Sequence, residues 1–199
     1  ASLIGAGALA LVATLGIAVC ARLFRRVNSA EVYFVALFLL SCTFELGRIL
    51  VPLADALLWP PSVAIIVSRV VLFSRLMGSL ALFAAGIYAV GADYPRIGSV
   101  SLVMAAITFV IVYFVPVNNS QMNASFLFEA GGGASVDLLL GFLGVGTIVN
   151  YIIGWARGHR EQSVTLVLAI VGLVAGRELL LHFTTMVALA SGFLVVAAA

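Results

Sequence analysis

The sequence predicts an all-α fold, a polytopic integral membrane bundle of six or seven transmembrane helices. Of its 199 residues, 64% are hydrophobic and 9% are charged, whereas about 25% of the residues in a typical soluble domain are charged. The mean hydropathy is +1.25. So few charges leave large apolar patches on any water-exposed surface, which excludes a water-soluble enzyme. At about 20 apolar residues per crossing, the chain has room for six or seven crossings with short connections.

Six apolar segments of membrane-spanning length follow one another and form one transmembrane domain, residues 1–199. Three arginines come after the first segment and none before it, which is the opposite of the charge order in a secretory signal peptide. The second segment starts at Asn28-Ser29-Ala30-Glu31, which is typical of a capping box, and ends at Trp59-Pro60-Pro61. The predicted spans are, in chain order, about 2–23, 31–58, 62–90, 97–115, 135–155 and 163–182.

The last apolar stretch is too long for one crossing. It runs from Ser163 to Ala199, and as a single helix it would measure about 55 Å, against a hydrocarbon core of about 30 Å. We expect the chain to turn near Phe183-Thr184-Thr185, a β-branched and polar interruption, and to form a short seventh span over 185–199. One long, kinked sixth helix is the alternative.

The arginines predict the orientation of the bundle. The first, third and fifth connections carry Arg25 with Arg26, Arg96, and Arg157 with Arg160, whereas the second and fourth carry none. Short loops that are rich in arginine stay on the cytoplasmic side. We therefore predict an N-terminus outside the cell and a location in the plasma (inner) membrane.

Six ionisable side chains lie at one predicted depth, in the outer halves of three helices. Such groups are costly inside a membrane, so they usually face the bundle interior or a wet cavity. Two of the carboxylates share a helix face with a basic neighbour, one at a spacing of three residues and the other at four. The candidate ligand-binding residues are Arg48, Arg69, Arg177, Glu45, Glu178 and His182.

These candidates carry three arginines and two glutamates, so one positive charge is left over. A guanidinium in this setting needs an acceptor, such as a backbone carbonyl, water, Asp55 or an anionic ligand. Arg69 and Arg75 are about 600° of helical turn apart and cannot face one centre, so we expect Arg75 to serve another neighbour or to snorkel. Three interpretations stay open: salt bridges that join helices, an outward-facing ligand site, and a proton or ion path.

Catalytic and cofactor chemistry finds no basis in the sequence. There is no lysine, which excludes a retinal Schiff base and a P-loop. Cys20 and Cys42 form no CxxC pair and are expected to be small packing residues. His159 and His182 are too few for paired haem ligation, and no HExxH zinc motif occurs. We expect no enzyme, no metal and no cofactor.

Small residues suggest close helix contacts. Gly141, Gly144 and Gly146 lie in one predicted helix and Ser74-xxx-Gly78 in another. Such spacings allow helices to approach closely, with a hinge or an oligomer interface as the alternative. The connection over 117–134 is expected to be a polar, flexible loop.

The sequence thus predicts a non-catalytic sensory or ligand-binding membrane module with an outward-facing, arginine-rich pocket for an anionic or amphiphilic ligand. In topology the chain resembles the seven-helix membrane modules that precede bacterial signalling domains. A small transporter or channel and a structural subunit of a membrane complex are the alternatives; a transporter needs a polar route past Ser74, Arg75 and Asn150. The expected partners are the lipid bilayer, an anionic small molecule or lipid, and a second copy or a larger membrane complex. The sequence contains no dense basic patch of the kind that binds nucleic acid, so no nucleic-acid partner is expected.

Overall fold

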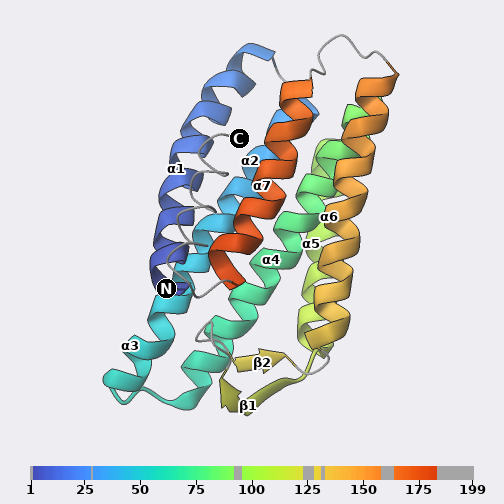
Figure 1. The fold of residues 1–199 in the computed structure, drawn as a ribbon. Helices are drawn as coiled ribbons and strands as arrows, with labels where there is room; N and C mark the ends of the chain where they lie inside the picture. Colours follow the sequence, from blue (N-terminus) through green and yellow to red (C-terminus); the bar gives the residue numbers. More distant parts are fainter. Residues whose placement is uncertain are drawn as a thin grey trace.

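The computed structural model describes residues 2–27, 29–91, 96–122, 128–130, 133–157 and 164–182, which form a bundle of helices with one short hairpin (Figure 1). The elements are α1 (Ser2–Val27), α2 (Ala30–Thr43), η1 (Phe44–Ile49), α3 (Leu50–Ala56), α4 (Pro61–Ala89), α5 (Ile97–Phe114), β1 (Val117–Met122), β2 (Phe128–Ala130), α6 (Gly133–Ala156) and α7 (Val164–His182).

Five helical stretches are long and apolar enough to cross a membrane, so the predicted helical membrane-type bundle is confirmed at this level. They are Gly7–Arg26, Ala30–Ala54, Pro61–Ala89, Ile97–Phe114 and Ala134–Ala156. Helix α7 occupies the range predicted for the sixth helix. The predicted seventh span, 185–199, lies outside the described residues.

The second span is not one regular helix, which corrects the expectation for 31–58. It consists of α2, a 3-10 segment, η1, and the short helix α3. Pro52 explains the break, because proline has no N–H to donate to the carbonyl of Arg48 and its ring clashes with that carbonyl. Instead, the N–H of Leu50 bonds to the carbonyl of Gly47, three residues back. The tight winding therefore falls at mid-span.

The helix starts follow the capping signals in the sequence. The Ser29 hydroxyl accepts a hydrogen bond of 3.2 Å from the backbone N–H of Glu31, which confirms a helix start at this point. Helix α4 begins with Pro61 at its first position, where a backbone N–H would have no acceptor.

Helix α4 is the central element and packs against α2, α5 and α6. Its contact with α2 depends on Gly78, because a Cβ there would overlap the Ser41 hydroxyl. This bears out the packing interpretation of Ser74-xxx-Gly78. Helix α7 packs against α1 and α6. The core of these contacts includes Phe34, Phe38, Cys42, Ala81, Leu82, Ala85 and Tyr151.

The two ends of the bundle differ. The connection over 117–134, expected as a loop, contains an antiparallel hairpin in which Val117 pairs with Ala130. The hairpin packs against α4 and lies at the same end of the bundle as α3 (Figure 1). The last residues of α1 and α6, with Arg26 and Arg157, lie at the opposite end. The arginine-bearing helix ends are therefore gathered on one side.

Candidate functional site

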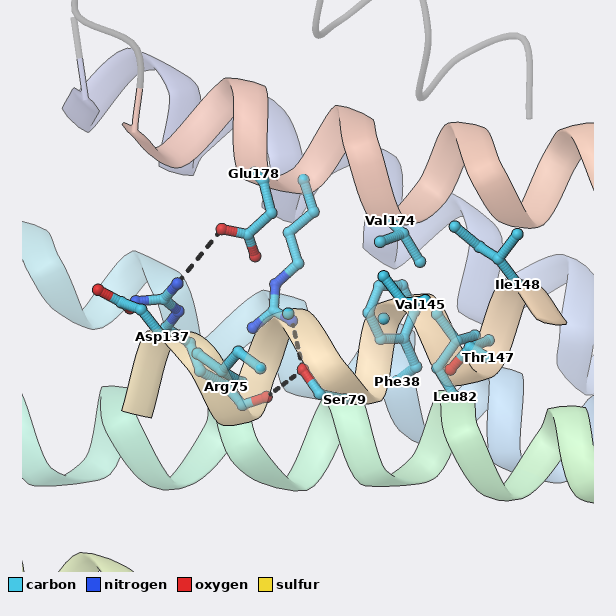
Figure 2. Close-up of a pocket in the computed structure, with 14 residues that line it drawn as sticks. Phe38, Arg75, Ser79, Leu82, Asp137, Val145, Thr147, Ile148, Val174 and Glu178 are labelled. Atoms are coloured by element: carbon cyan, nitrogen blue, oxygen red, sulfur yellow. Dashed lines mark hydrogen bonds and ion pairs between the residues drawn. The ribbon is translucent and has the colours of Figure 1, made fainter. Parts of the chain in front are cut away.

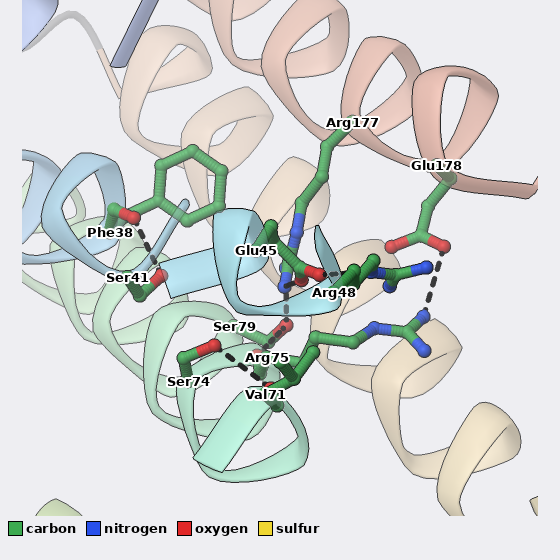
Figure 3. Close-up of polar contacts among 10 residues, drawn as sticks. All are labelled: Phe38, Ser41, Glu45, Arg48, Val71, Ser74, Arg75, Ser79, Arg177 and Glu178. Carbon is green, nitrogen blue, oxygen red and sulfur yellow. Dashed lines mark hydrogen bonds and ion pairs between the residues drawn. The ribbon is translucent and has the colours of Figure 1, made fainter. Parts of the chain in front are cut away.

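One buried carboxylate, that of Glu45, lies between two arginines (Figure 3). Arg48 Nε donates to Glu45 Oε2 at 2.8 Å, and Arg177 Nη2 donates to Glu45 Oε1 at 3.4 Å. Side chains three residues apart are eclipsed in a 3-10 helix, so η1 brings Glu45 and Arg48 together. The three side chains are at most 4% exposed. We call them the buried triad; two arginines and one glutamate give it a net charge of +1.

Arg177 connects α7 to three other elements. Besides its ion pair with η1, its Nη1 donates to the Ser79 hydroxyl of α4 at 3.2 Å. Its guanidinium carbon lies 5.7 Å from the centroid of the Phe38 ring of α2, a cation–π distance. The Ser79 hydroxyl in turn donates to the backbone carbonyl of Arg75 at 2.9 Å. Arg177 is thus positioned from several sides (Figure 3).

A second ion pair lies beside the buried triad and is more open. Arg75 Nη2 donates to Glu178 Oε2 at 3.3 Å, which joins α4 to α7. The Arg75 side chain is 12% exposed, and the Glu178 side chain is 43% exposed. This pair therefore lies at the rim of the charged region, while the buried triad lies below it.

A cavity of about 310 Å³ opens between α4, α6 and α7. Figure 2 shows that its charged and apolar side chains occupy different ends. Gly141 and Gly144 of α6 form part of its wall, and a Cβ at Gly141 would meet no atom within 4 Å. The charged and polar end is formed by Arg75, Ser79, Asp137 and Glu178, and the apolar end by Phe38, Leu82, Ile148 and Val174. Arg177 belongs to the charged end, because it donates to Ser79.

The structure brings together four of the six residues that the sequence singled out. They are Glu45, Arg48, Arg177 and Glu178. Arg69 lies elsewhere, in a groove between α4 and α5. His182 is the last residue of α7, and its side chain lies outside the described part.

The expected directions of the two arginines of α4 are reversed. As predicted, Arg69 and Arg75 do not face one centre, but it is Arg75 that faces the charged cluster and pairs with Glu178. Spacing along a helix fixes only the angle between two side chains and leaves open how the helix is rotated in the bundle. The small residues Ser74 and Gly78 mark the face of α4 that packs in the core. Arg75 is adjacent to that face, so these two residues were the sequence signal for its inward direction.

Three residues of the site were not among those predicted from the sequence: Ser79, Asp137 and Phe38. Ser79 follows Arg75 by four residues and therefore shares its face, so this contact was within reach of the same spacing argument. Asp137 lies near the end of its apolar segment, where a carboxylate gives no signal of an intramembrane site. Phe38 carries no sequence signal that separates it from other core aromatic residues.

The chemistry of the site is that of ion pairs around a cavity. Within the described ranges, no group of three or more His, Cys, Asp or Glu side chains is arranged to hold a metal ion. Cys20 and Cys42 are buried and not bonded to each other, as expected of packing residues. No protein-family model matches the chain, and no curated protein matches it significantly. What the fold and site define is therefore a membrane-type helical bundle with an arginine-lined cavity.

Proposed function

We propose that this protein is a non-catalytic membrane module that binds an anionic amphiphile in the cavity between α4, α6 and α7. The observation that carries the proposal is the net charge of +1 of the buried triad, together with the position of Arg177 in the cavity wall. Of the two other carboxylates in that wall, Glu178 pairs with Arg75 and Asp137 is exposed. A buried, incompletely compensated guanidinium is costly in a low-dielectric environment, and an anionic headgroup offsets that cost. The apolar end of the cavity suits the hydrocarbon part of the same ligand.

A sensory role follows from the way in which α7 is held. Among the described residues, its polar links to α4 include the Arg75–Glu178 ion pair and the Arg177–Ser79 hydrogen bond, both at the charged end of the cavity. A headgroup that binds the two arginines competes with these links. Ligand binding then shifts the position of α7 relative to α4, provided that the two positions differ in ligand affinity.

The residues beyond the cavity favour this module over a transporter or channel. Toward the arginine-bearing end, the bundle is filled by apolar and aromatic residues such as Phe34, Ala85 and Tyr151, each at most 1% exposed. The Ser74 hydroxyl donates a hydrogen bond of 2.9 Å to the backbone carbonyl of Val71. A permeation path would need a continuous polar route in this region. The apolar packing therefore favours a bundle whose inner half is closed to ions and polar substrates.

The location and the partners belong to the same proposal. The module lies in the plasma (inner) membrane with its N-terminus outside, since short arginine-rich connections stay in the cytoplasm. Along α6, the charged end of the cavity at Asp137 then lies nearer the outer surface than the apolar end at Ile148. Assembly with a second copy, or as a structural subunit of a larger membrane complex, remains the alternative use of the lipid-facing surface.

Native mass spectrometry of the protein in mild detergent tests the cavity. Gly141→Leu places a side chain in the cavity wall without replacing a charged residue, and a Cβ at this position meets no atom within 4 Å. Gly98→Leu is the matched control, since Gly98 on α5 also has open space but lines none of the cavity. We expect a bound mass of a few hundred daltons in the wild type and in Gly98→Leu, and its loss in Gly141→Leu.

The same instrument tests the charge of the ligand with two probes of equal chain length, laurate and dodecanol. A charge-assisted hydrogen bond contributes about 1.5–3 kcal/mol, so we expect laurate to bind at least about tenfold more tightly. Equal binding of both probes contradicts the anionic headgroup. Equal adducts in Gly141→Leu and the wild type contradict the cavity itself, and the charges then serve only to join helices.

A further inference from the structure

Arg69 lies on a different side of α4 from the cavity. It is part of a groove of about 230 Å³ between α4 and α5, whose other walls include Phe73, Phe109 and Tyr113. Arg48, Arg75 and Arg177 each pair with a carboxylate. Among the residues that the structure describes, Arg69 has no such pair, and its Nε is buried without a hydrogen-bond partner.

The depth of Arg69 in the bilayer explains how it can lack a carboxylate partner among the described side chains. Helix α4 has 29 residues, so it is about 43 Å long and extends about 7 Å beyond a centred 30 Å hydrocarbon core at each end. Arg69 comes eight residues after Pro61, which places its Cα about 5 Å inside the core. An arginine side chain spans that distance and brings its charge to the headgroup layer.

Arg75 provides the internal comparison. By the same arithmetic its Cα lies about 14 Å inside the core, close to the middle of the bilayer and too deep for its side chain to reach the headgroup layer. Arg75 accordingly pairs with Glu178. The two arginines of one helix thus differ in partner because they differ in depth, and the partner within reach of Arg69 is the headgroup layer.

Aromatic residues border the groove on the α5 side. The rings of Phe109 and Tyr113 are stacked, with centroids 6.3 Å apart and planes inclined by 22°. Tyr113 is 62% exposed and lies next to Phe114, the last residue of α5. Tyrosine favours the membrane interface, where its ring is in hydrocarbon and its hydroxyl meets polar groups. The groove therefore offers a phenol near the guanidinium.

An apolar path leads from Arg69 toward the centre of the bilayer. Val70 and Phe73 line both the Arg69 groove and a neighbouring groove of about 280 Å³. The neighbouring groove adds apolar side chains of α2 and α4, including Leu37, Leu40 and Met77. A hydrocarbon chain that starts at Arg69 can thus follow α4 inward along one continuous surface.

We infer that Arg69 binds the phosphate of a bilayer phospholipid, with one acyl chain of that lipid lying in the groove along α4. Guanidinium pairs with phosphate through two parallel hydrogen bonds, and it does so more effectively than a point charge such as an ammonium group. The phosphate of the lipid lies at Arg69, the region below it lies against the aromatic side chains, and the acyl chain lies in the apolar groove. This site is independent of the cavity between α4, α6 and α7.

Retention of lipid in native mass spectrometry tests this site. The protein is reconstituted in phosphatidylglycerol, transferred to mild detergent and activated stepwise in the gas phase. We expect the wild type to keep one phosphatidylglycerol after the others are removed. Arg69→Gln should lose it, and Arg157→Gln is the matched control, since Arg157 is an exposed arginine at the other end of the bundle.

A second variant tests the acyl groove without altering a charge. Val70 is 44% exposed and lines both grooves, so Val70→Trp obstructs the apolar path and should also abolish retention. Leu102→Trp is its control, at a position on α5 that is 70% exposed. Val70→Trp decides the question if Arg69→Gln does not give a monodisperse protein on size exclusion.

Two results would overturn the inference. Equal retention in the wild type, Arg69→Gln and Val70→Trp places the lipid elsewhere. Release of the retained lipid by excess inorganic phosphate would mean that the site recognises the phosphate ion alone; we expect the lipid to stay, because its acyl chain contributes to binding.

Discussion

Glu45 is the residue on which the charged site depends. Its two carboxylate oxygens each serve a different arginine, one three residues away and one on α7. Both arginines are at most 4% exposed, and removing the shared partner leaves two uncompensated buried charges. Losing one partner of a buried ion pair is far more costly than losing a pair at the surface.

We therefore expect Glu45→Gln and Glu178→Gln to differ in stability. Glu45→Gln should lower the free energy of unfolding by about 3–5 kcal/mol, because it leaves buried guanidinium groups without a countercharge. The Glu178 side chain is 43% exposed and lines the open cavity, so Glu178→Gln leaves Arg75 facing the cavity instead of closed protein and should cost less than Glu45→Gln. Denaturant unfolding in one detergent measures both, and equal losses would contradict the distinction between triad and rim.

The sequence allowed part of this site to be predicted. The spacing of Glu45 and Arg48 showed that they share a face, and the structure confirms their contact. The contact of Arg177 with Glu45 required two elements that are 132 residues apart to meet at one depth. The depth of a residue in the membrane can be estimated from its distance to the start of its helix. The rotation of α4 about its axis, which turns Arg75 and not Arg69 toward the charged site, depends on packing.

At the level of elements, η1 is the feature that places the charges. Pro52 was visible in the sequence as a helix-breaking residue inside an apolar segment, so the break in the second span was predictable in principle. The hairpin of β1 and β2 was not, because its sequence over 117–134 is polar and lacks the alternation of a strand. The break in the second span follows from one residue, Pro52, whereas the hairpin depends on its tertiary contact with α4.

Pro52→Ala should regularise the second span. The new backbone N–H can bond to the Arg48 carbonyl, so amide hydrogen exchange in a peptide over 44–56 should become slower. Pro61→Ala is the control, because Pro61 occupies a helix position whose N–H has no acceptor. Unchanged exchange in Pro52→Ala would mean that packing against α4, rather than proline, imposes the 3-10 winding.

The contact between α2 and α4 makes a second prediction at this scale. Gly78→Ala introduces a methyl group that overlaps the Ser41 hydroxyl, and such overpacking costs about 1–3 kcal/mol. Gly141→Ala is the matched helix glycine with free space in front of it, and it should stabilise by about 0.5–1 kcal/mol through helix propensity. Thermal unfolding measures the stability of both variants. An unchanged stability in Gly78→Ala would contradict the packing argument.

At the scale of the whole molecule, the sequence predicted the class of fold and the arrangement of the ends. Composition and segment length were sufficient for a helical bundle, because each crossing must satisfy its own backbone hydrogen bonds. The alternation of arginines along the chain matches the helix ends that share one side of the bundle. Which helices become neighbours, such as α4 with α6, was not encoded in any local pattern.

Cysteine labelling in intact cells tests the orientation. Ser135 and Arg157 are exposed near opposite ends of α6. We expect Ser135→Cys to react with a membrane-impermeant maleimide from outside, and Arg157→Cys to react only after permeabilisation. The wild type is the control, since Cys20 and Cys42 are buried. The reverse pattern would place the N-terminus in the cytoplasm.

The ion pairs of this bundle differ in when they can form during biosynthesis. Glu45 and Arg48 compensate each other as soon as their own segment has left the ribosome. Arg75 enters the membrane long before Glu178 is synthesised, because 103 residues separate them. We therefore expect α4 to stay beside the translocon until α7 arrives. A chain arrested before α7 lacks the Glu178 countercharge of Arg75 near mid-bilayer, where charged side chains are costly.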